Sequence, residues 1–575
     1  MKNKKISGAE AVIHCLLNEG VDLVWGYPGG AIMPVYDEFY KFQDKLKHVL
    51  ARHEQGAIHA AQGYARSSGR VGVAIATSGP GATNLVTGIA DAQIDSTPVV
   101  CITGQVPSHL LGSDAFQETD IIGISMPVTK WNYQITKASE IPEIFAKAFY
   151  IAKSGRPGPV LIDITKDAQF ELCKYAYQKC DGIRSYFPYP VINNDSIDSA
   201  VALINKAKKP FIVWGQGVIL GKAEEEFKNF VEKSGIPAAW TILGLSALPT
   251  SHELNVGMVG MHGNYGPNIL TNKCDLLIAI GMRFDDRVTG DPSTYASQAK
   301  IIHLEIDPAE VDKNIKVDVP VIGNCKESLK MITDKIDKRS HKKWISKFDD
   351  LMKIEFDKVI KSDLSPNKKG LTMGESIIAI NDYTKGDAII VTDVGQHQMV
   401  ACRYANFIRS KSNITSGGLG TMGFALPAAM GAKMGALDRE DLKVLSAIVQ
   451  DAVFPVTEIR WDSAHRRLGL LLNRFRWEDN EKAKRQGRDV ERVQSLLVFE
   501  NVIKVASQGV DRAQTDMVLS VLSLNAQEAN GAENVIITLA GDGAIRVTCE
   551  AIEVTLKDVA RPYLALSKKT PQHPA

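Results

Sequence analysis

The chain has 575 residues, 45% of them hydrophobic and 23% charged, with a formal net charge of +1. These values are typical of a globular protein of about three or four domains, and the near-zero charge argues against nucleic-acid and membrane-surface partners. The eight cysteines form no Cys-x-x-Cys pair, no apolar run reaches about 18 residues, and the basic start runs into a helical pattern. A disulfide framework, a zinc site, a membrane span and a signal peptide are therefore not expected, and a cytoplasmic location is predicted.

Residues 1–170 alternate helical patterns with short apolar runs, as in a parallel sheet covered on both faces. Strands are predicted at 21–25, 71–76, 98–103 and 160–164. Gly-rich or polar loops follow three of them, GYPGG (26–30), TSGPGATN (77–84) and TGQVP (103–107). Ligands of such sheets bind at the carboxyl ends of the strands, so these loops are candidate binding elements.

Two further α/β units are predicted. After a polar linker at 171–184, the second unit has strands at 210–214, 276–280 and 301–306, and Lys-rich solvated helix and linker follow at 326–369. The third unit opens with a strand at 388–392 and the loop DVGQHQ (393–398). It continues with SGGLGTMGFALPAAMGAKMGA (416–436), a Gly-rich loop running into a helix of small residues.

The character of the chain changes near residue 436. Residues 1–436 contain 38 Lys and 10 Arg, whereas residues 437–575 contain 7 Lys and 12 Arg. Lys and Arg are comparable as helix formers, so two differently biased sequences joined together explain the reversal. Asp438 is a candidate cap for a helix through about residue 453, and the β-rich runs after it predict an antiparallel sheet.

Several strings in residues 1–436 together carry a family resemblance. RHEQGAIHAAQGYAR (52–66), SDAFQETD (113–120), GRPGPVLIDI (155–164) and GMRFDDRVTG (281–290) stand in order with GYPGGA, TSGPGATN, DVGQHQM and GGLGTMGFALPAA. This series closely resembles the large catalytic subunit of acetohydroxyacid synthase (acetolactate synthase). That family condenses two 2-oxo acids, pyruvate with pyruvate or 2-oxobutyrate, with loss of CO2 in branched-chain amino acid biosynthesis. The resemblance implies thiamine diphosphate, Mg²⁺ and a bound FAD with no redox role.

The resemblance also implies residue roles near the reacting atoms. Glu54 would bond N1′ of the aminopyrimidine, although alone it reads as a carboxylate stabilised at a helix N-terminus. The backbone at Gly30 would face the developing oxyanion, and Arg287 would orient the second substrate's carboxylate. Phe116, Gln117 and Lys166 match pocket residues near the substrates. The alternatives are core packing for Phe116, a surface amine for Lys166, and an ion pair with Asp285 or Asp286 for Arg287.

Cofactor positions follow from the same resemblance. For thiamine diphosphate the matching residues are Val394, Gly395, Gln396, His397, Gly420 and Met422, where Met422 would bend the cofactor unless it is ordinary core. For FAD they are Arg156, Gly215, Gly217, Thr241, His262, Gly263, Arg283, Asp285, Glu305 and Asp307. Glycines allow close backbone approach to a diphosphate, and an acidic residue after a strand suits ribose hydroxyls.

The family pattern stops after GAKMGA. The family continues into a strand, Gly-Asp-Gly, and Asn-Asn about 26 residues later, and hard oxygen ligands of this kind suit Mg²⁺. Here the expected place reads LDREDLKVLSAIVQDAVFP, and no metal ligand is assigned. The later AGDGAIRV (540–547) is flanked by two apolar runs, so Asp542 is interpreted as part of a hairpin turn.

Residues 437–575 resemble an uncharacterised family of small bacterial proteins, a domain of unknown function, through DLKVLSAIVQDAVFPVTEI, LGLLLNRFRWE, RVQSLLVF, QGVDR and GDGAIRVTCEAIEVTLKDVARP. The predicted fold is α/β, a thiamine-diphosphate-enzyme type three-domain architecture with parallel sheets and a truncated third domain, followed by a β-rich α+β domain. The predicted domains are a pyrimidine-binding domain (1–170), an FAD-binding-like domain (185–345), an incomplete diphosphate-binding domain (370–436) and the unrelated domain (437–575).

The join has two explanations, a natural fusion or an artificial one, and the second is favoured because the cut falls inside a domain. The chain as written is predicted to be inactive. The alternatives are an FAD-retaining binding or regulatory subunit, and activity retained through an unrecognised metal site. The resemblance further implies a homodimer or tetramer, with or without a regulatory small subunit.

Overall fold

A computed structural model describes residues 5–365, 370–435, 439–477, 479, 483, 489, 491–511, 513–529, 532–549 and 554–564. The chain divides into two compact units, Met1–Lys433 and Met434–Ala575, and each is described by itself. The predicted join at residue 436 and the predicted helix cap at Asp438 lie outside the described residues.

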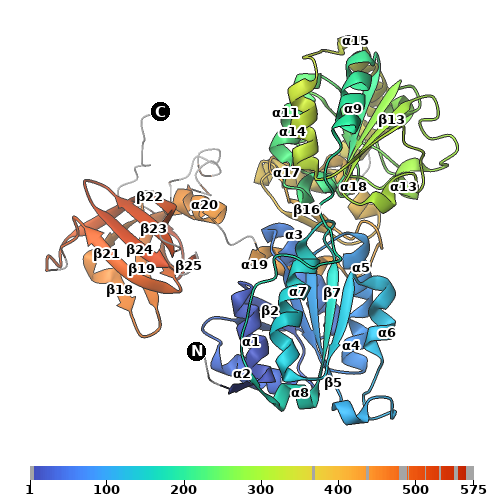
Figure 1. The fold of residues 1–575 in the computed structure, drawn as a ribbon. Coiled ribbons are helices and arrows are strands. Elements are labelled where there is room, and N and C mark those ends of the chain that lie inside the picture. Colours follow the sequence, from blue (N-terminus) through green and yellow to red (C-terminus); the bar gives the residue numbers. More distant parts are fainter. Residues whose placement is uncertain are drawn as a thin grey trace. The chain divides into compact units, whose positions relative to one another are not determined.

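The N-terminal part of the first unit is a parallel sheet with helices on both faces (Figure 1). Its strands, in spatial order, are β3 (Lys47–Leu50), β2 (Leu23–Gly26), β4 (Gly72–Ala76), β5 (Val99–Gln105), β7 (Pro159–Thr165) and β6 (Trp131–Ile135). Every residue of β4, β5 and β7 is buried. The four predicted strands are confirmed with small shifts at their ends, because strands buried on both faces read as continuous apolar runs.

The central part is a second parallel sheet. Its strands, in spatial order, are β11 (Asn255–Met258), β10 (Ala238–Trp240), β9 (Pro210–Trp214), β12 (Leu276–Ile280), β13 (Lys300–Glu305) and β14 (Val319–Ile322). The helices α9 (Asn194–Lys206), α11 (Glu224–Ser234) and α14 (Cys325–Lys335) contribute to one core cluster, and α12 (Tyr265–Thr271) and α15 (Lys342–Glu355) to another. The predicted strands at 210–214 and 276–280 have the observed bounds.

Two predictions for connecting segments need correction. The linker at 171–184 begins with β8 (Leu172–Lys174), which pairs antiparallel with β1 (Lys5–Ser7). The Lys-rich segment is not wholly solvated, because Trp344 and Phe348 of α15 are buried in the core of the central part. Both features depend on partners far away in the sequence, which a local pattern does not contain.

The last part of the first unit carries a small parallel sheet. Within the described residues, β15 (Ile390–Thr392) and β16 (Asn413–Thr415) pair with each other and with no other strand. The helices here are α17 (Met373–Thr384), α18 (Gln396–Tyr404) and α19 (Ala425–Gly435). The α19 helix packs against α3 (Glu54–Ser68), where a Cβ on Gly63 would lie only 1.9 Å from the carbonyl oxygen of Ala428.

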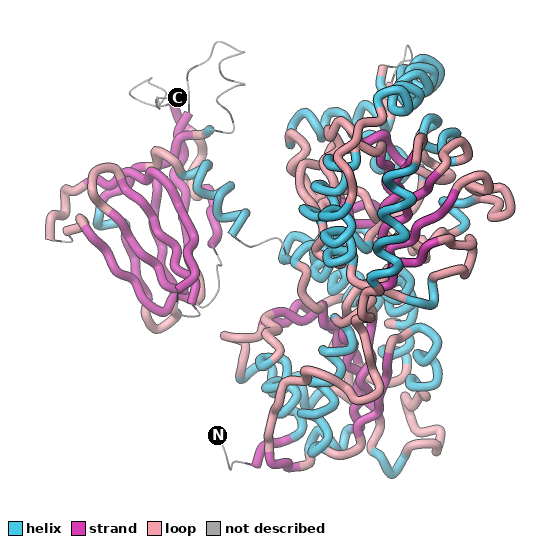
Figure 2. Tube along the Cα trace, turned by 45° about the horizontal axis from the view of Figure 1, so that its top comes forward, coloured by secondary structure: helices cyan, strands magenta, loops and turns pink. Residues whose placement is uncertain are grey.

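The second unit is the predicted antiparallel sheet, accompanied by α20 (Arg439–Val449) (Figure 2). In spatial order the strands are β21 (Val502–Gln508), β24 (Ala544–Cys549), β23 (Ala532–Leu539), β22 (Val518–Ala529), β17 (Val453–Pro455), β19 (Arg467–Phe475), β20 (Glu491–Phe499) and β25 (Val554–Asp558). The helix ends before the predicted residue 453, because the chain there joins the sheet as β17. Asp542 lies in the turn between the paired strands β23 and β24.

Candidate functional site

The Gly-rich loops of the N-terminal part meet at the carboxyl ends of neighbouring strands. The loop after β2 contacts the loop after β4, since Ala31 N–H donates to Thr77 Oγ1 at 3.2 Å and a Cβ on Gly29 would lie 2.5 Å from Thr77 Cγ2. Gly30 is exposed, and no heavy atom lies within 4 Å of a Cβ built on it. The Gly30 backbone therefore borders open space of the kind a bound ligand needs.

Glu54 is a buried carboxylate beside these loops. It is the first residue of α3 and is 6% exposed. Asn84 Nδ2, at the end of α4 (Pro80–Asn84), donates to Glu54 Oε2 at 2.9 Å, and no described residue donates to Oε1. Oε1 is not among the buried side-chain atoms that lack a partner, so it keeps contact with solvent and is open to a ligand donor.

The predicted substrate residues take different positions around this cluster. Gln117 lies against the loop after β4, because its carbonyl oxygen would be 2.7 Å from a Cβ on Gly79. Phe116 is 88% exposed, so the alternative of core packing is wrong for this chain. Lys166 begins α8 (Lys166–Phe170) and is half-buried, and it forms neither a hydrogen bond nor an ion pair with Glu54.

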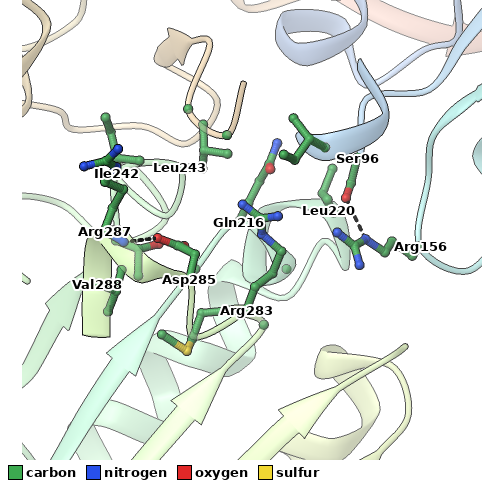
Figure 3. Close-up of a pocket in the computed structure, with 18 of the residues that line it drawn as sticks. Ser96, Arg156, Gln216, Leu220, Ile242, Leu243, Arg283, Asp285, Arg287 and Val288 are labelled. Atoms are coloured by element: carbon green, nitrogen blue, oxygen red, sulfur yellow. Dashed lines mark hydrogen bonds between the residues drawn. The ribbon is translucent and has the colours of Figure 1, made fainter. Parts of the chain in front are cut away.

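A cavity of about 740 Å³ lies at the carboxyl ends of the central strands (Figure 3). Arg156 and Ser96 lie on one side of it, and Arg287, Asp285 and Val288 on the other. Eight of the residues predicted to bind FAD line it: Arg156, Gly215, Gly217, Thr241, His262, Arg283, Asp285 and Glu305. Gly263 and Asp307 do not line it, although Asp307 accepts a hydrogen bond from Arg156 Nη1 at 3.1 Å.

The glycines of this cavity are required by packing. A Cβ on Gly215 would lie 2.4 Å from the Gly281 carbonyl oxygen, and one on Gly217 would lie 2.5 Å from the Gly281 Cα. The loops after β9 and β12 thus approach as only glycine permits. The resulting cavity, with bare backbone and a buried acid at the end of a strand, fits a dinucleotide such as FAD.

Glu305 supplies that buried acid at the end of β13. Burial raises the pKa of its carboxyl to about 7, against the lowering effect of the Asp307 and Ile306 N–H groups. Next to it, burial lowers the pKa of His303, and His303 Nε2 lies 2.8 Å from the Met282 carbonyl oxygen. At neutral pH the cavity wall therefore carries a carboxyl that a ligand can shift between its two protonation states.

Glu305→Gln should flatten the pH dependence of stability of the first unit. Because the folded pKa lies above the unfolded value, the folded state binds the extra proton between about pH 4.5 and 7. As the pH rises through this window, wild-type stability should fall by roughly 3 kcal/mol because of this group alone, and Glu305→Gln should lack that fall. Thermal unfolding at a series of pH values measures it.

Glu310→Gln is the control for this prediction. Burial would raise the pKa of Glu310, but hydrogen bonds from Arg156 and Lys313 outweigh it and the pKa is lowered. Glu310 thus contributes stability that is present above the unfolded pKa and is lost as the pH falls, so its removal should change the slope in the opposite direction. Identical slopes for wild type and Glu305→Gln would contradict the assignment.

Arg287 and two of the residues predicted to bind thiamine diphosphate also line this cavity. Val394 and Gly420 line it together with Arg287. Arg287 is largely exposed, and its side-chain Nε lies 3.5 Å from Asp286 Oδ2. Its backbone N–H donates a hydrogen bond to Asp285 Oδ1 at 3.0 Å. The ion-pair alternative is therefore confirmed for Asp286, and the exposure of the Arg287 guanidinium leaves it accessible to a carboxylate.

The other predicted cofactor residues surround the start of α18 and the loop before α19. Gly395 is the N-cap of α18, with Gln396 and His397 exposed beside it. Gly420 has φ +71°, which favours glycine. Met422 is 78% exposed, so its alternative of ordinary core packing is wrong here.

The donor set for Mg²⁺ does not fit. No group of three or more His, Cys, Asp or Glu side chains suited to a metal occurs among the described residues. Asp393, the first residue of the predicted loop DVGQHQ, already accepts hydrogen bonds from the N–H groups of Val394, Gly423 and Ala425. Both of its carboxylate oxygens therefore stabilise the surrounding loops and are not free to bind a metal ion.

A hydrogen-bonded network that joins the third part to the N-terminal part was not predicted from the sequence. Asp91 and Asp95 are buried, Ser416 and Thr421 donate to Asp91, and the N–H groups of Gly417 and Gly418 donate to Asp95. Asn84, the partner of Glu54, was also missed. The one available signal was the placement of acids and amides within apolar, small-residue helices.

Comparisons with known proteins agree with this arrangement. Family models for thiamine pyrophosphate enzymes match residues 6–124 (N-terminal TPP binding domain), 197–332 (central domain) and 393–454 (C-terminal TPP binding domain). A model for a protein of unknown function (DUF2948) matches residues 432–573, so the last two matches overlap at 432–454. No helix in the described part of the chain is long and apolar enough to cross a membrane.

Relatives match over most of the chain. The acetolactate synthase large subunit of Corynebacterium glutamicum is 47% identical over 460 residues, 79% of this chain and 72% of that protein. That of Lactococcus lactis is 43% identical over 433 residues, 75% of this chain and 74% of that protein. A probable acetolactate synthase large subunit from Methanocaldococcus jannaschii is 45% identical over 437 residues, which cover 75% of this chain and 73% of that protein. The chain therefore belongs to the acetolactate synthase large subunit family of thiamine-diphosphate enzymes, and it carries a DUF2948 domain at its C-terminal end.

Proposed function

We propose that this chain keeps the pyrimidine-side and FAD-side elements of an acetolactate synthase large subunit but forms no acetolactate. The observation that carries the proposal is the course of the chain after α19. Where the family's Gly-Asp-Gly and Asn-Asn are expected, the chain enters α20 and an antiparallel sheet. Hard oxygen ligands that hold Mg²⁺ on a diphosphate are thereby missing from the sequence.

On the pyrimidine side, the chain's own residues would bind and orient thiamine diphosphate. When bound, that cofactor supplies the carbon nucleophile. Glu54 Oε1 would accept a hydrogen bond from the aminopyrimidine, with Asn84 holding the carboxylate in place through Oε2. The open space at Gly30 would admit the reacting group, and Gln117 would lie beside it.

On the FAD side, the large cavity supports retention of a flavin. Gly215 and Gly217 would face the diphosphate, and Glu305 would accept from ribose hydroxyls. Arg287, at the same cavity, would hold the carboxylate of the second 2-oxo acid. Retention of FAD in this cavity supports the second candidate function, an FAD-retaining binding or regulatory subunit.

An assay of acetolactate formation tests the proposal. The purified chain is supplied with pyruvate, thiamine diphosphate, Mg²⁺ and FAD, and the C. glutamicum large subunit serves as the active control. No acetolactate above the blank is expected from this chain. Formation that depends on Mg²⁺ and thiamine diphosphate would overturn the proposal and favour an unrecognised metal site.

The flavin spectrum of the same preparation separates the alternatives. Absorbance of bound flavin without acetolactate formation supports the FAD-retaining binding subunit. Loss of flavin on Gly217→Val would place it in the large cavity, because a side chain there meets the Gly281 backbone. The domain bounds, the homodimer or tetramer, the regulatory small subunit and the cytoplasmic location stay predictions.

A further inference from the structure

A second cavity of about 570 Å³ lies in the first unit and has no assigned ligand. Its wall includes residues at the amino ends of the N-terminal strands, opposite to the edge that carries Gly30 and Glu54. The volume lies within the range of about 300–1,000 Å³ typical of small-molecule sites. Its charged lining residues are Glu19, Arg66, Arg70, Lys153, Lys222 and Lys411.

Three of the five cations in this lining have carboxylate partners. Arg66 Nη2 lies 2.7 Å from Asp95 Oδ2, and Arg70 Nη1 lies 2.8 Å from Asp22 Oδ2. Lys153 Nζ lies 3.6 Å from Glu19 Oε2, whose other oxygen accepts from Tyr177. These ion pairs neutralise the one acidic residue of the lining, Glu19, and three of the five cations of the lining.

Lys222 and Lys411 remain without an ion pair among the described residues. Both are held at left-handed backbone angles, with φ of +52° and +60°. Such angles are unfavourable for a residue other than glycine. The two ammonium groups of Lys222 and Lys411 have no carboxylate partner in the described part of the chain and give the lining a charge of +2, which matches a phosphate monoester dianion.

Two further features favour a phosphate that carries an aromatic ring. Asn324, the N-cap of the eleven-residue helix α14, lines both cavities, so the positive end of that helix also borders the second one. Tyr189 lines both cavities, and the residue is 56% exposed. An exposed aromatic face is a stacking surface for a base.

We propose that this second cavity binds a phosphate-bearing anion of nucleotide size, with its phosphate between Lys222 and Lys411 and its ring on Tyr189. The site adjoins the large cavity but has its own cations. Lys222 and Lys411 line only the second cavity, whereas Arg283 and Glu305 line only the first, and Gln216, Leu220 and Tyr189 form part of the wall that the two share. The inference does not depend on the proposed loss of acetolactate formation.

Calorimetric titration of the full chain with AMP, in the presence of excess FAD, tests the proposal. AMP should bind, adenosine should bind at least tenfold more weakly, and inorganic phosphate should bind more weakly than AMP. The double variant Lys222→Gln/Lys411→Gln should weaken AMP binding at least about tenfold, since it removes both charge-assisted contacts to the phosphate. The double variant Lys222→Arg/Lys411→Arg should restore most of it.

Arg283→Gln is the matched control, because it removes a cation from the large cavity only. AMP affinity should be unchanged in this variant. Loss of AMP binding in Arg283→Gln, unchanged binding in the double Gln variant, equal binding of adenosine and AMP, or no AMP binding at millimolar concentration would each overturn the proposal. Equal affinity for phosphate and AMP would overturn the nucleotide part of it.

Discussion

Arg66→Leu should lower the free energy of unfolding of the first unit by about 4 kcal/mol. The Arg66 side chain is 8% exposed and Asp95 is fully buried, with 2.7 Å between Nη2 and Oδ2. Arg66 also donates to Thr97 Oγ1 and to the Thr415 carbonyl oxygen. Its removal leaves a buried carboxylate beside Asp91 without its cation, which is the costly way to break a buried pair.

The loss should depend on pH. Burial already raises the pKa of Asp95, and the Arg66 charge opposes that rise. Without Arg66 the folded-state pKa rises further above the unfolded value, so protonation recovers stability as the pH falls. Urea unfolding should therefore show a larger deficit at pH 8 than at pH 5.

Arg70→Leu is the control on the same side of the N-terminal sheet. The Arg70–Asp22 pair is about half exposed at both side chains, and such pairs contribute about 0–1 kcal/mol. A similar loss for Arg66→Leu and Arg70→Leu, or a deficit independent of pH, would contradict the prediction.

Gly63→Ala should destabilise the contact between α3 and α19 by about 3 kcal/mol. The new Cβ would lie 1.9 Å from the Ala428 carbonyl oxygen, and a Cβ on Gly431 would lie 1.8 Å from that of Ala60. Both obstacles are backbone atoms, so the helices must move apart. Scanning calorimetry should show a lower transition temperature for Gly63→Ala than for the wild type, and amide hydrogen exchange should be faster in α19.

Gly56→Ala is the matched control, because it places the same substitution in the same helix. A Cβ on Gly56 meets nothing within 4 Å, and alanine in a helix interior is favoured over glycine by up to about 1 kcal/mol. Gly56→Ala should therefore stabilise slightly. If Gly63→Ala behaved in the same way, the close packing of α3 on α19 would be wrong.

Much of the secondary structure was predictable from local patterns. The strands at 210–214 and 276–280 were predicted with their observed bounds, because central strands of a parallel sheet are apolar along their whole length and end in glycine or polar residues. Asp542 was predicted in a turn, since Asp-Gly between two apolar runs is a strong hairpin signal. The family resemblance was readable because Gly-rich loops of defined order leave little freedom of sequence.

The site was predictable only as a set of residues. The resemblance named Glu54, but the Asn84 donor and the free Oε1 depend on how two loops meet in space. The exposure of Phe116 and Met422 was likewise not readable, because a lone apolar side chain in a loop looks the same in a sequence whether it is buried or exposed. The roles of these residues stay predictions.

The sequence by itself therefore determined the order of elements, the change of character near residue 436 and the absence of the Gly-Asp-Gly and Asn-Asn motif at its expected place. Only the tertiary structure decided the pairing of β1 with β8, the docking of α19 on α3, the raised pKa of Glu305 and the two cavities. The physical reason is the distance along the sequence over which each kind of interaction acts. Propensity and periodicity act over a few neighbouring residues, whereas burial, ion pairing and close backbone contact join residues that are hundreds of positions apart.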